Sequence, residues 1–253
     1  MNGDAVRVER EGELAIVTLD RPERRNALGS RDARAVVDAI TQGSHGARVV
    51  ILTGAGDAFS AGGDLDELER WSDLEPSEIG ATLYESFQGM IRAIRSADAV
   101  VIAAINGAAV GAGMDLALAC DLRIAAESAR LGQVWVRLGV IPGTGGAWLT
   151  QHLAGPGRAA QLLLTGELID AREALDAGLV NEVCPAAELM ERARALAAKI
   201  LAHPPAGVVA NKRALVAAAR DGLEAALSHA AEVQPERFTS EEFRRAVRAA
   251  RAR

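Results

Sequence analysis

The stretch AINGAAVGAGMDLALACD at residues 104–121 joins the end of an apolar run to a glycine-rich turn and a second apolar segment. The run over 99–105 predicts a buried strand, and the segment after Gly111 and Gly113 predicts a short helix. Where a strand, a glycine turn and a helix start meet, main-chain N–H groups point outward and bind a negatively charged oxygen. Glycine there lets a ligand approach the main chain closely. Asp115 falls in the first turn of this helix.

A second glycine turn, SAGGD at residues 60–64, has the same character. It comes shortly after the apolar run over 49–53, which predicts another buried strand. Either turn alone is equally consistent with a plain reversal of the chain. As a pair, the two turns predict an oxyanion hole built from main-chain N–H groups.

The composition is that of an ordinary globular protein. The 253 residues are 49% hydrophobic and 25% charged, which is enough apolar material for a core without a metal or disulfide. A net charge of −6 and an aromatic content of 3% argue against nucleic acid as a partner. No apolar run reaches about 18 residues and no signal-peptide pattern opens the chain, so we expect no membrane span and a cytoplasmic location. Cys120 and Cys184 lie in apolar runs, which predicts buried, reduced thiols.

Apolar strands alternate with helices along most of the chain, which predicts an α/β core covered on both faces of its sheet. The expected strands lie at 6–10, 14–19, 49–53, 99–105, 122–126 and 179–183, and expected helices include 30–41, 65–71, 78–95, 147–154, 156–164 and 170–177. From about residue 186 the chain becomes alanine-rich and helical. We therefore divide it into a core at 1–185 and a helical C-terminal region at 186–253.

Two nucleotide-binding motifs fail on their spacing. Gly54 and Gly56 are not followed by the third glycine of G-x-G-x-x-G, and the glycines at 143–146 are not followed by Lys-Ser or Lys-Thr. No histidine has a partner at metal-ligand spacing, so no metal is expected.

Four segments in order along the chain resemble the crotonase superfamily, the enoyl-CoA hydratase/isomerase family. They are DRPERRNAL at 20–28, AFSAGGDL at 58–65, the stretch at 104–121 and LGVIPGTGG at 138–146. Residues 165–180 are similar to the segment that follows in the family. Each piece is weak alone, but the ordered set covers almost the whole chain.

This resemblance implies a fold and a chemistry. The fold is a right-handed spiral of ββα units with a helical C-terminal region used in trimer assembly, so a homotrimer or a dimer of trimers is expected. The chemistry acts on an acyl-CoA thioester through its enolate, and CoA is part of the substrate rather than a separate cofactor. The resemblance assigns the two oxyanion donors to Gly63 and Ala112; the second is usually glycine in the family, but alanine keeps the N–H.

The acid/base positions depart from the family pattern. Hydratase-like members carry two glutamates, and this chain has Asp115 and Trp135 at those positions. Aspartate is one methylene shorter, roughly 1.5 Å, and an indole N–H only donates hydrogen bonds. The usual two-carboxylate hydration is therefore not available, and the base of one-glutamate isomerases is missing too. Dehalogenases with a tryptophan here need an aspartate where this chain has Gly143.

Both positions also have plainer readings. Asp115 at a helix start is a favourable partner for the helix dipole, and Trp135 is a candidate wall of the acyl pocket. The carboxylates nearest in sequence, Asp66, Glu67 and Glu85, are more typical of a solvated helix face.

The resemblance places the binding of CoA and the acyl group in the same segments. The basic loop contributes Arg24 and Arg25, because guanidinium groups suit phosphates. Asp64 also fits a helix cap before residue 65. The full binding set is Arg24, Arg25, Ala27, Leu28, Ala61, Asp64, Leu65, Pro142 and Gly143. Arginines near the C-terminus, among them Arg244 and Arg251, form a second basic set that is equally typical of a solvated face.

The default function is hydration of a 2-enoyl-CoA. The altered carboxylates leave isomerisation, decarboxylation and thioester hydrolysis open as alternatives. A homologue that binds acyl-CoA without catalysis is an alternative of another class.

Overall fold

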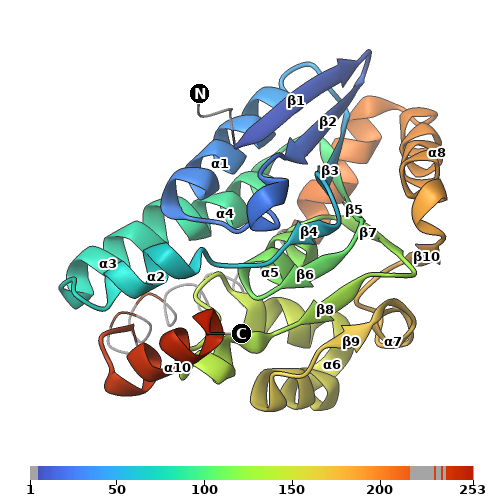
Figure 1. The fold of residues 1–253 in the computed structure, drawn as a ribbon. Coiled ribbons are helices and arrows are strands. Elements are labelled where there is room, and N and C mark those ends of the chain that lie inside the picture. The colour runs from blue at the N-terminus through green and yellow to red at the C-terminus, as the bar shows by residue number, and fades with distance from the viewer. Residues whose placement is uncertain (1–4, 217–230, 232–234, 236–237, 253) are drawn as a thin grey trace.

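The computed structural model describes residues 5–216, 231, 235 and 238–252. Its strands form two sheets (Figure 1). The six-stranded sheet has the order β1 (Val6–Glu11), β2 (Leu14–Leu19), β3 (Val49–Gly54), β5 (Val100–Ile105), β7 (Leu122–Ala126) and β10 (Glu182–Cys184). The four-stranded sheet has the order β4 (Ala58–Ser60), β6 (Ala108–Val110), β8 (Arg130–Gly132) and β9 (Ile169–Asp170).

Successive strands alternate between the two sheets. Strands β3, β5 and β7 lie parallel in the larger sheet, and each is followed within a few residues by β4, β6 or β8 in the smaller one. A long antiparallel hairpin, β1–β2, closes one edge of the larger sheet. This stepwise alternation, together with the likeness to solved crotonase-fold structures given below, confirms the expected α/β spiral.

The larger sheet is buried on both faces. Val50 and Leu52 of β3 belong to the main core, whereas Val49 and Ile51 face a second core that also holds residues of α8 (Leu189–Leu201). Alternate side chains of a strand point to opposite faces, so a strand covered on both sides has to be apolar throughout. In Figure 1, α1 (Ser30–Ser44) and α4 (Gln88–Ser96) lie on the face of the sheet opposite to α8.

Several helices match the expected segments. Helix α2 (Leu65–Trp71) begins after the first glycine turn, α5 (Ala112–Ala119) after the second, and α7 (Ala171–Asp176) after its cap Asp170. The two helices expected at 147–154 and 156–164 are α6 (Gly146–Thr165), which is broken at Gly155 (φ 76°) before Pro156. The described residues also form four short helical turns, η1 (Pro22–Arg24), η2 (Leu83–Phe87), η3 (Val134–Leu138) and η4 (Ala186–Glu188).

Some expected boundaries were wrong. No strand was expected between residues 53 and 99, but β4 lies there, and the strand expected at 179–183 is the shorter β10, shifted toward the C-terminus. Strands of two or three residues carry too little periodicity for the sequence to reveal them. The helix expected at 78–95 is continuous but consists of α3 (Pro76–Thr82), the π-helical turn η2 and α4.

The described C-terminal helices pack on the core. Helix α8 contacts β3, β5 and β7, and α10 (Glu241–Arg251) contacts α2 and η3. The division at residue 186 stays a prediction. Cys120 and Cys184 are buried free thiols. None of the helices in the described residues is both long and apolar enough to cross a membrane.

Candidate active site

The two glycine turns lie against each other. Strand β4, which precedes the first turn, pairs in parallel with β6, which precedes the second. A Cβ built on Gly62 would lie 2.5 Å from the Val110 carbonyl oxygen and 3.5 Å from the Ala112 nitrogen. A Cβ on Gly113 would lie 2.5 Å from the Ser60 carbonyl oxygen. The main chains of the two turns thus touch at positions where only glycine fits.

The second turn has a backbone that requires glycine at one position. Gly111 has φ 53° and ψ −120°, which an L-residue adopts only with strain. Ala112 follows as the first residue of α5 and has a negative φ. An alanine side chain is therefore compatible with this position, where the family usually has glycine.

The N–H groups of Gly63 and Ala112 are both unused by the fold. Leu28 forms an isolated parallel bridge with Gly63. In this bridge the Leu28 N–H donates to the Gly62 carbonyl (2.7 Å) and the Asp64 N–H donates to the Leu28 carbonyl (2.9 Å). The Gly63 N–H takes part in neither bond. The first N–H groups of a helix have no intrahelical acceptor, and Ala112 is at that position. Among the hydrogen bonds of the described residues, neither N–H has an acceptor.

A buried asparagine fixes the basic loop beside the first turn. Asn26 has φ 55°, and its Nδ2 donates to the carbonyls of Ala55 (2.9 Å) and Ala58 (2.8 Å). Its carbonyl accepts from the Ser60 hydroxyl (2.8 Å), and the Ala61 N–H donates to the Arg25 carbonyl (2.9 Å). These bonds bring the predicted binding residues at 24–28 next to those at 61–65. In the sequence, Asn26 was only one residue of the motif at 20–28, and no structural role was predicted for it.

Asp115 is completely buried and held by neutral donors. Gln133 Nε2 donates to its Oδ1 at 2.6 Å, and the Thr144 hydroxyl donates to its Oδ2. Gly146 packs so closely that a Cβ there would lie 2.0 Å from Oδ1. Burial raises the pKa of Asp115 to about 6, although the Thr144, Gln133 and Trp135 donors act in the opposite direction. A carboxyl group with a pKa near neutrality and no cationic partner is typical of acid/base sites.

Trp135 lies beside both Asp115 and the second turn. Its indole is 6% exposed and packs on Gly111, where a Cβ would meet the ring at 3.4 Å. The Nε1–H is close enough to Asp115 to favour the carboxylate, yet it makes no full hydrogen bond within the described chain. The side chain expected as a pocket wall is therefore placed between the carboxylate and the turn that carries Ala112.

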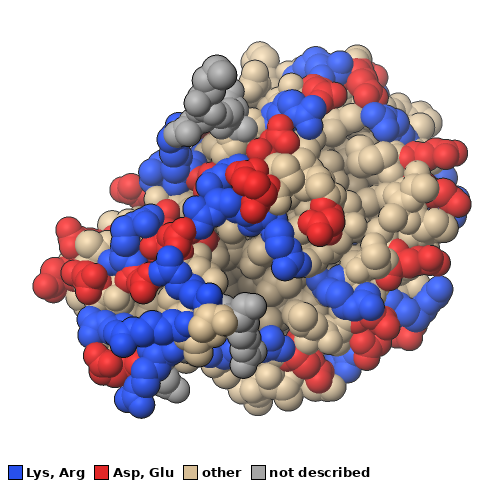
Figure 2. All heavy atoms as spheres, in the orientation of Figure 1, with Lys and Arg blue, Asp and Glu red and all other residues tan. Residues whose placement is uncertain are grey.

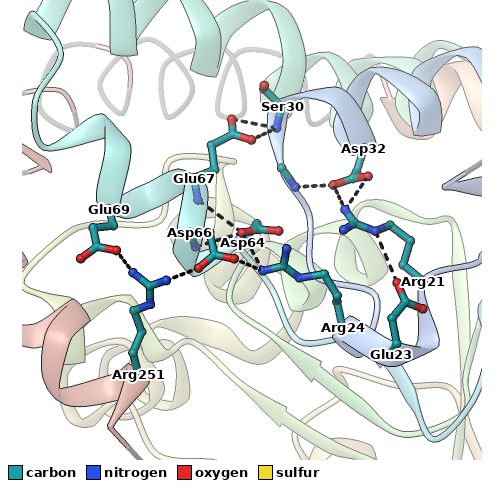
Figure 3. A network of polar contacts seen from close by, with 11 residues as sticks. Arg21, Glu23, Arg24, Ser30, Asp32, Asp64, Asp66, Glu67, Glu69 and Arg251 are labelled. Atoms are coloured by element: carbon teal, nitrogen blue, oxygen red, sulfur yellow. Dashed lines mark hydrogen bonds and ion pairs between the residues drawn. The ribbon is translucent and has the colours of Figure 1, made fainter. Parts of the chain in front are cut away.

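Arg24, expected at the CoA phosphates, is already paired. It binds Asp64 Oδ1 at 3.3 Å and also Asp66, and Asp66 in turn binds Arg251 of α10 (Figure 3). The hydrogen bond with Asp66 raises the pKa of Arg24, and the same bond lowers the pKa of Asp66. On the face in Figure 2, basic and acidic side chains are interspersed in the same way. Arg25 is exposed.

The remaining acidic side chains of this region have structural partners. Asp64 caps α2 by accepting from the N–H groups of Asp66 and Glu67, as expected. The Glu67 carboxylate accepts from the Ser30 N–H at 2.9 and 3.0 Å, and Arg251 also binds Glu69 (Figure 3). Glu85 is exposed on the turn η2. The carboxylate nearest to the second turn is therefore Asp115.

Sequence reasoning missed three residues that hold Asp115 or its surroundings. Gln133 and Thr144 bond it directly, and Gln88 bonds the carbonyl of Gly143. Thr144 lies within the quoted motif at 138–146, and Gln133 lies two residues before Trp135, so the sequence could have indicated both. No sequence signal pointed to Gln88. Gly143 is buried, and Pro142 and Leu65 are half-buried. In the described part of the chain, no cluster of His, Cys, Asp and Glu is arranged for a metal ion.

Comparisons with known proteins agree with this geometry. A family model described as "Enoyl-CoA hydratase/isomerase" matches residues 9–251. The short-chain-enoyl-CoA hydratase of Clostridium acetobutylicum is 38% identical over 245 residues, which is 96% of this chain and 92% of that protein. The crotonyl-CoA hydratase of Syntrophomonas wolfei is 37% identical over 91% of this chain and 87% of its own length.

Solved structures are similar over the whole fold. The enoyl-CoA hydratase of Bacillus halodurans superposes with a TM-score of 0.90 at 27% identity, covering 97% of this chain and 99% of that one. An enoyl-CoA hydratase/isomerase of Mycobacterium paratuberculosis has a TM-score of 0.89 at 30% identity, covering 98% of each chain. Identity at this level over nearly full length supports an enzyme of the same kind.

Proposed function

The chain belongs to the enoyl-CoA hydratase/isomerase family, and from this premise we propose that it hydrates a 2-enoyl-CoA at an oxyanion hole formed by Gly63 and Ala112. The observation that carries the proposal is the contact between the two glycine turns, together with the unused N–H groups of these residues. Addition of water at C3 of the acyl group moves negative charge onto the thioester oxygen. Two fixed N–H donors lower the energy of that charge in the transition state. In other enzymes, each such donor raises the rate by about 10²–10³-fold.

Asp115 supplies the proton transfers in this proposal. Its pKa of about 6 leaves it mostly ionised at neutral pH, so it accepts a proton from the attacking water while the hydroxyl oxygen bonds to C3. The resulting carboxylic acid then gives the same proton to C2 of the enolate, which restores the thioester and the carboxylate. One carboxylate thereby carries both steps that two glutamates share elsewhere in the family. Access to the acyl carbons requires the Trp135 indole to turn aside.

The substrate enters along the loop at 24–28. Arg25, exposed and next to the first turn, is the phosphate ligand we propose for CoA, and Arg24 joins it only by leaving Asp64 and Asp66. We propose no cofactor besides the CoA of the substrate, and a cytoplasmic location. Assembly as a trimer or a dimer of trimers is supported by exposed apolar side chains on η3, at the end of α6 and just after it, namely Val136, Leu164 and Leu168.

The proposal is tested by removing one N–H. Ala112 is the first residue of α5, where proline fits the helical φ and costs no intrahelical bond. Ala112→Pro deletes the proposed donor, and we expect crotonyl-CoA hydration to fall by about 10²-fold or more. Ala112→Gly keeps the N–H and is the matched control, with activity within about threefold. Equal activity in both variants, each shown to be folded by circular dichroism, would contradict the oxyanion hole.

The burial of Asp115 favours a second candidate reaction. A carboxylate enclosed by Gln133, Thr144 and Gly146 is poorly placed to reach substrate. Decarboxylation of a 2-carboxyacyl-CoA needs the oxyanion hole but no base, because loss of CO₂ itself produces the enolate. Mass spectrometry of products from crotonyl-CoA and malonyl-CoA distinguishes the two reactions. Turnover of neither thioester would contradict both.

A further inference from the structure

Among the described residues, the turn η2 is π-helical. Within the continuous helix formed by α3, η2 and α4, the Gln88 N–H bonds the Leu83 carbonyl, five residues back. Such π-helical turns are rare and occur often at functional sites. Three consecutive residues at the end of this turn, Ser86, Phe87 and Gln88, are all buried. In an α-helix they would span about 200°, wider than one apolar face, so the widened turn buries a polar side chain beside apolar ones.

The Gln88 amide is held at both ends. Its Nε2 donates to the Gly143 carbonyl at 3.1 Å, and its Oε1 accepts from Arg92 Nη2 at 3.1 Å. A carbonyl needs a donor and a guanidinium needs an acceptor, so these partners fix which end of the amide is nitrogen. Arg92 also donates to the Tyr84 carbonyl at 3.2 Å, which ties the pair back to the π-helical turn. Gln88 itself is 0% exposed.

The carbonyl that Gln88 holds begins the turn which encloses Asp115. The next residue, Thr144, donates its hydroxyl to Asp115 Oδ2. Gly145 follows with φ 84° as the N-cap of α6, and Gly146, the first residue of α6, packs against Asp115 Oδ1. The turn at 143–146 therefore contacts both carboxylate oxygens of Asp115, and its first peptide is fixed from α4.

We propose that Gln88 is a positioning residue for the Asp115 carboxylate and acts through the Gly143 carbonyl and the turn at 143–146. Gln88 does not touch Asp115, so the effect passes through the main chain. As a role in catalysis, the inference rests on the proposed function of Asp115. Its structural part, the control of the carboxylate by a residue on α4, does not depend on which reaction is catalysed.

Loss of the Gln88 amide has a defined consequence. The Gly143 peptide loses its anchor, and the Thr144 hydroxyl no longer has a fixed direction toward Oδ2. Hydrogen bonds to the ionised form lower the pKa of a carboxyl group, so loosening this bond favours the protonated form. The other groups that act on Asp115 are the Gln133 amide and the Trp135 indole, which do not titrate near neutrality.

The ionisation of Asp115 is measured directly by ¹³C NMR of carboxyl-labelled aspartate in the full chain, with Asp115→Asn to assign its signal. The expected midpoint in the wild type is about 6. In Gln88→Met, which keeps the length and removes the bonds to Gly143 and Arg92, we expect it to rise by about half a pH unit or more. The matched control is Ser86→Ala on the same turn, whose hydroxyl accepts from Arg34 at 2.8 Å and not from the 143–146 turn. Its midpoint should equal that of the wild type.

Kinetics add a second readout. If Asp115 works as proposed, kcat of crotonyl-CoA hydration falls in Gln88→Met while KM stays within about twofold, and the acidic limb of the pH–rate profile moves with the NMR midpoint. An unchanged midpoint in Gln88→Met, with a shifted midpoint in Thr144→Val, would overturn the inference. Should Gln88→Met not fold, Arg92→Met removes one of the two anchors and is expected to shift the midpoint in the same direction, but less.

The two failures are distinguishable. A wild type that turns over no thioester, but whose Asp115 midpoint responds to Gln88→Met, contradicts the proposed function and supports the positioning role. A wild type that hydrates crotonyl-CoA, but whose midpoint does not respond, supports the function and overturns the role of Gln88.

Discussion

Two aspartates near the glycine turns, Asp66 and Asp115, have the same side chain in opposite surroundings. Asp66 is half-buried at the start of α2 between Arg24 and Arg251, and the hydrogen bond with Arg24 holds its pKa below the usual range (Figure 3). Asp115 is buried among neutral donors, and its pKa is raised to about 6. Cations stabilise a carboxylate, and burial without cations destabilises it.

The difference bears on which of the two carboxylates is the better candidate for the proposed proton transfer. A carboxylate bound to two guanidinium groups is a poor base, because a proton must compete with both cations. A carboxylate with a pKa near the working pH exchanges protons readily in both directions. Asp66 thus joins parts of the chain through ion pairs, whereas Asp115 is the carboxylate we propose for proton transfer.

The largest expected difference is in catalysis. Asp115→Asn should lower the rate of crotonyl-CoA hydration by about 10²–10⁴-fold, the usual contribution of general acid–base catalysis. Asp66→Asn should change it less than about threefold, because Asp66 takes no part in proton transfer. The measurement is the loss of enoyl absorbance at saturating substrate. Similar losses in both variants would remove the distinction between the two aspartates.

A smaller effect is expected from filling the space beside Asp115. In Gly146→Ala the new methyl would lie 2.0 Å from Oδ1, so the turn or the carboxylate must move. Overpacking of this kind costs about 3 kcal/mol at the upper end of its usual range. Gly157→Ala, in the same helix with nothing within 4 Å, is the control and should be neutral or stabilising by about 0.5–1 kcal/mol. Urea unfolding of both variants checks this; equal stabilities would mean that the enclosure of Asp115 is loose.

The pH dependence of stability should have opposite signs at the two residues. The pKa of Asp115 is raised by folding, so its stabilising contribution is complete below its unfolded pKa of about 3.8 and is lost as the pH rises through about 6. Relative to Asp115→Asn, the free energy of unfolding should fall by about 2 kcal/mol between about pH 4.5 and 7.5. Asp66 has a lowered pKa, so its contribution is present above its unfolded pKa and is lost as the pH falls. Urea titrations at both pH values test the signs, and a common sign would refute the comparison.

The smallest effect concerns the ion pairs themselves. Arg251, Asp66 and Glu69 have side chains 39%, 37% and 44% exposed. Exposed ion pairs contribute about 0–1 kcal/mol, so Arg251→Met should lower the free energy of unfolding by less than about 1 kcal/mol. The loss should vanish at about 1 M salt, where charges are screened within about 3 Å. A large loss that persists in salt would assign α10 a role through packing rather than charge.

The fold was predictable because its signals are local. Continuous apolar runs identified β2, β3, β5 and β7, and the glycine turns at 60–64 and 111–113 identified where the main chains meet. The oxyanion donors were assigned by resemblance to a family, and their convergence on one oxygen stays a prediction, supported by the backbone contacts between the two turns. Strands of two or three residues, such as β4 and β9, escaped because their pairing partners determine them and their own sequence does not.

The surroundings of the site were less predictable because they depend on distant partners. The sequence shows Arg24 as a cation near a binding loop, but it does not show that Asp64 and Asp66 bind it. It shows a glutamine at position 88, but its bond to Gly143 spans 55 residues. Which neutral donor faces which carboxylate is decided by packing, and a single sequence contains no direct record of packing.

The mutual contact of Gly62 and Gly113 with the opposite main chain has an evolutionary consequence. The separation between the two turns is fixed by atoms that every residue possesses, so it does not depend on the side chains around the acyl group. If the two turns form the proposed oxyanion hole, replacing those side chains, as with tryptophan at position 135, would leave the hole in place while changing which groups can transfer protons. A scaffold of this type is free to diversify its chemistry without rebuilding the element that makes the chemistry possible.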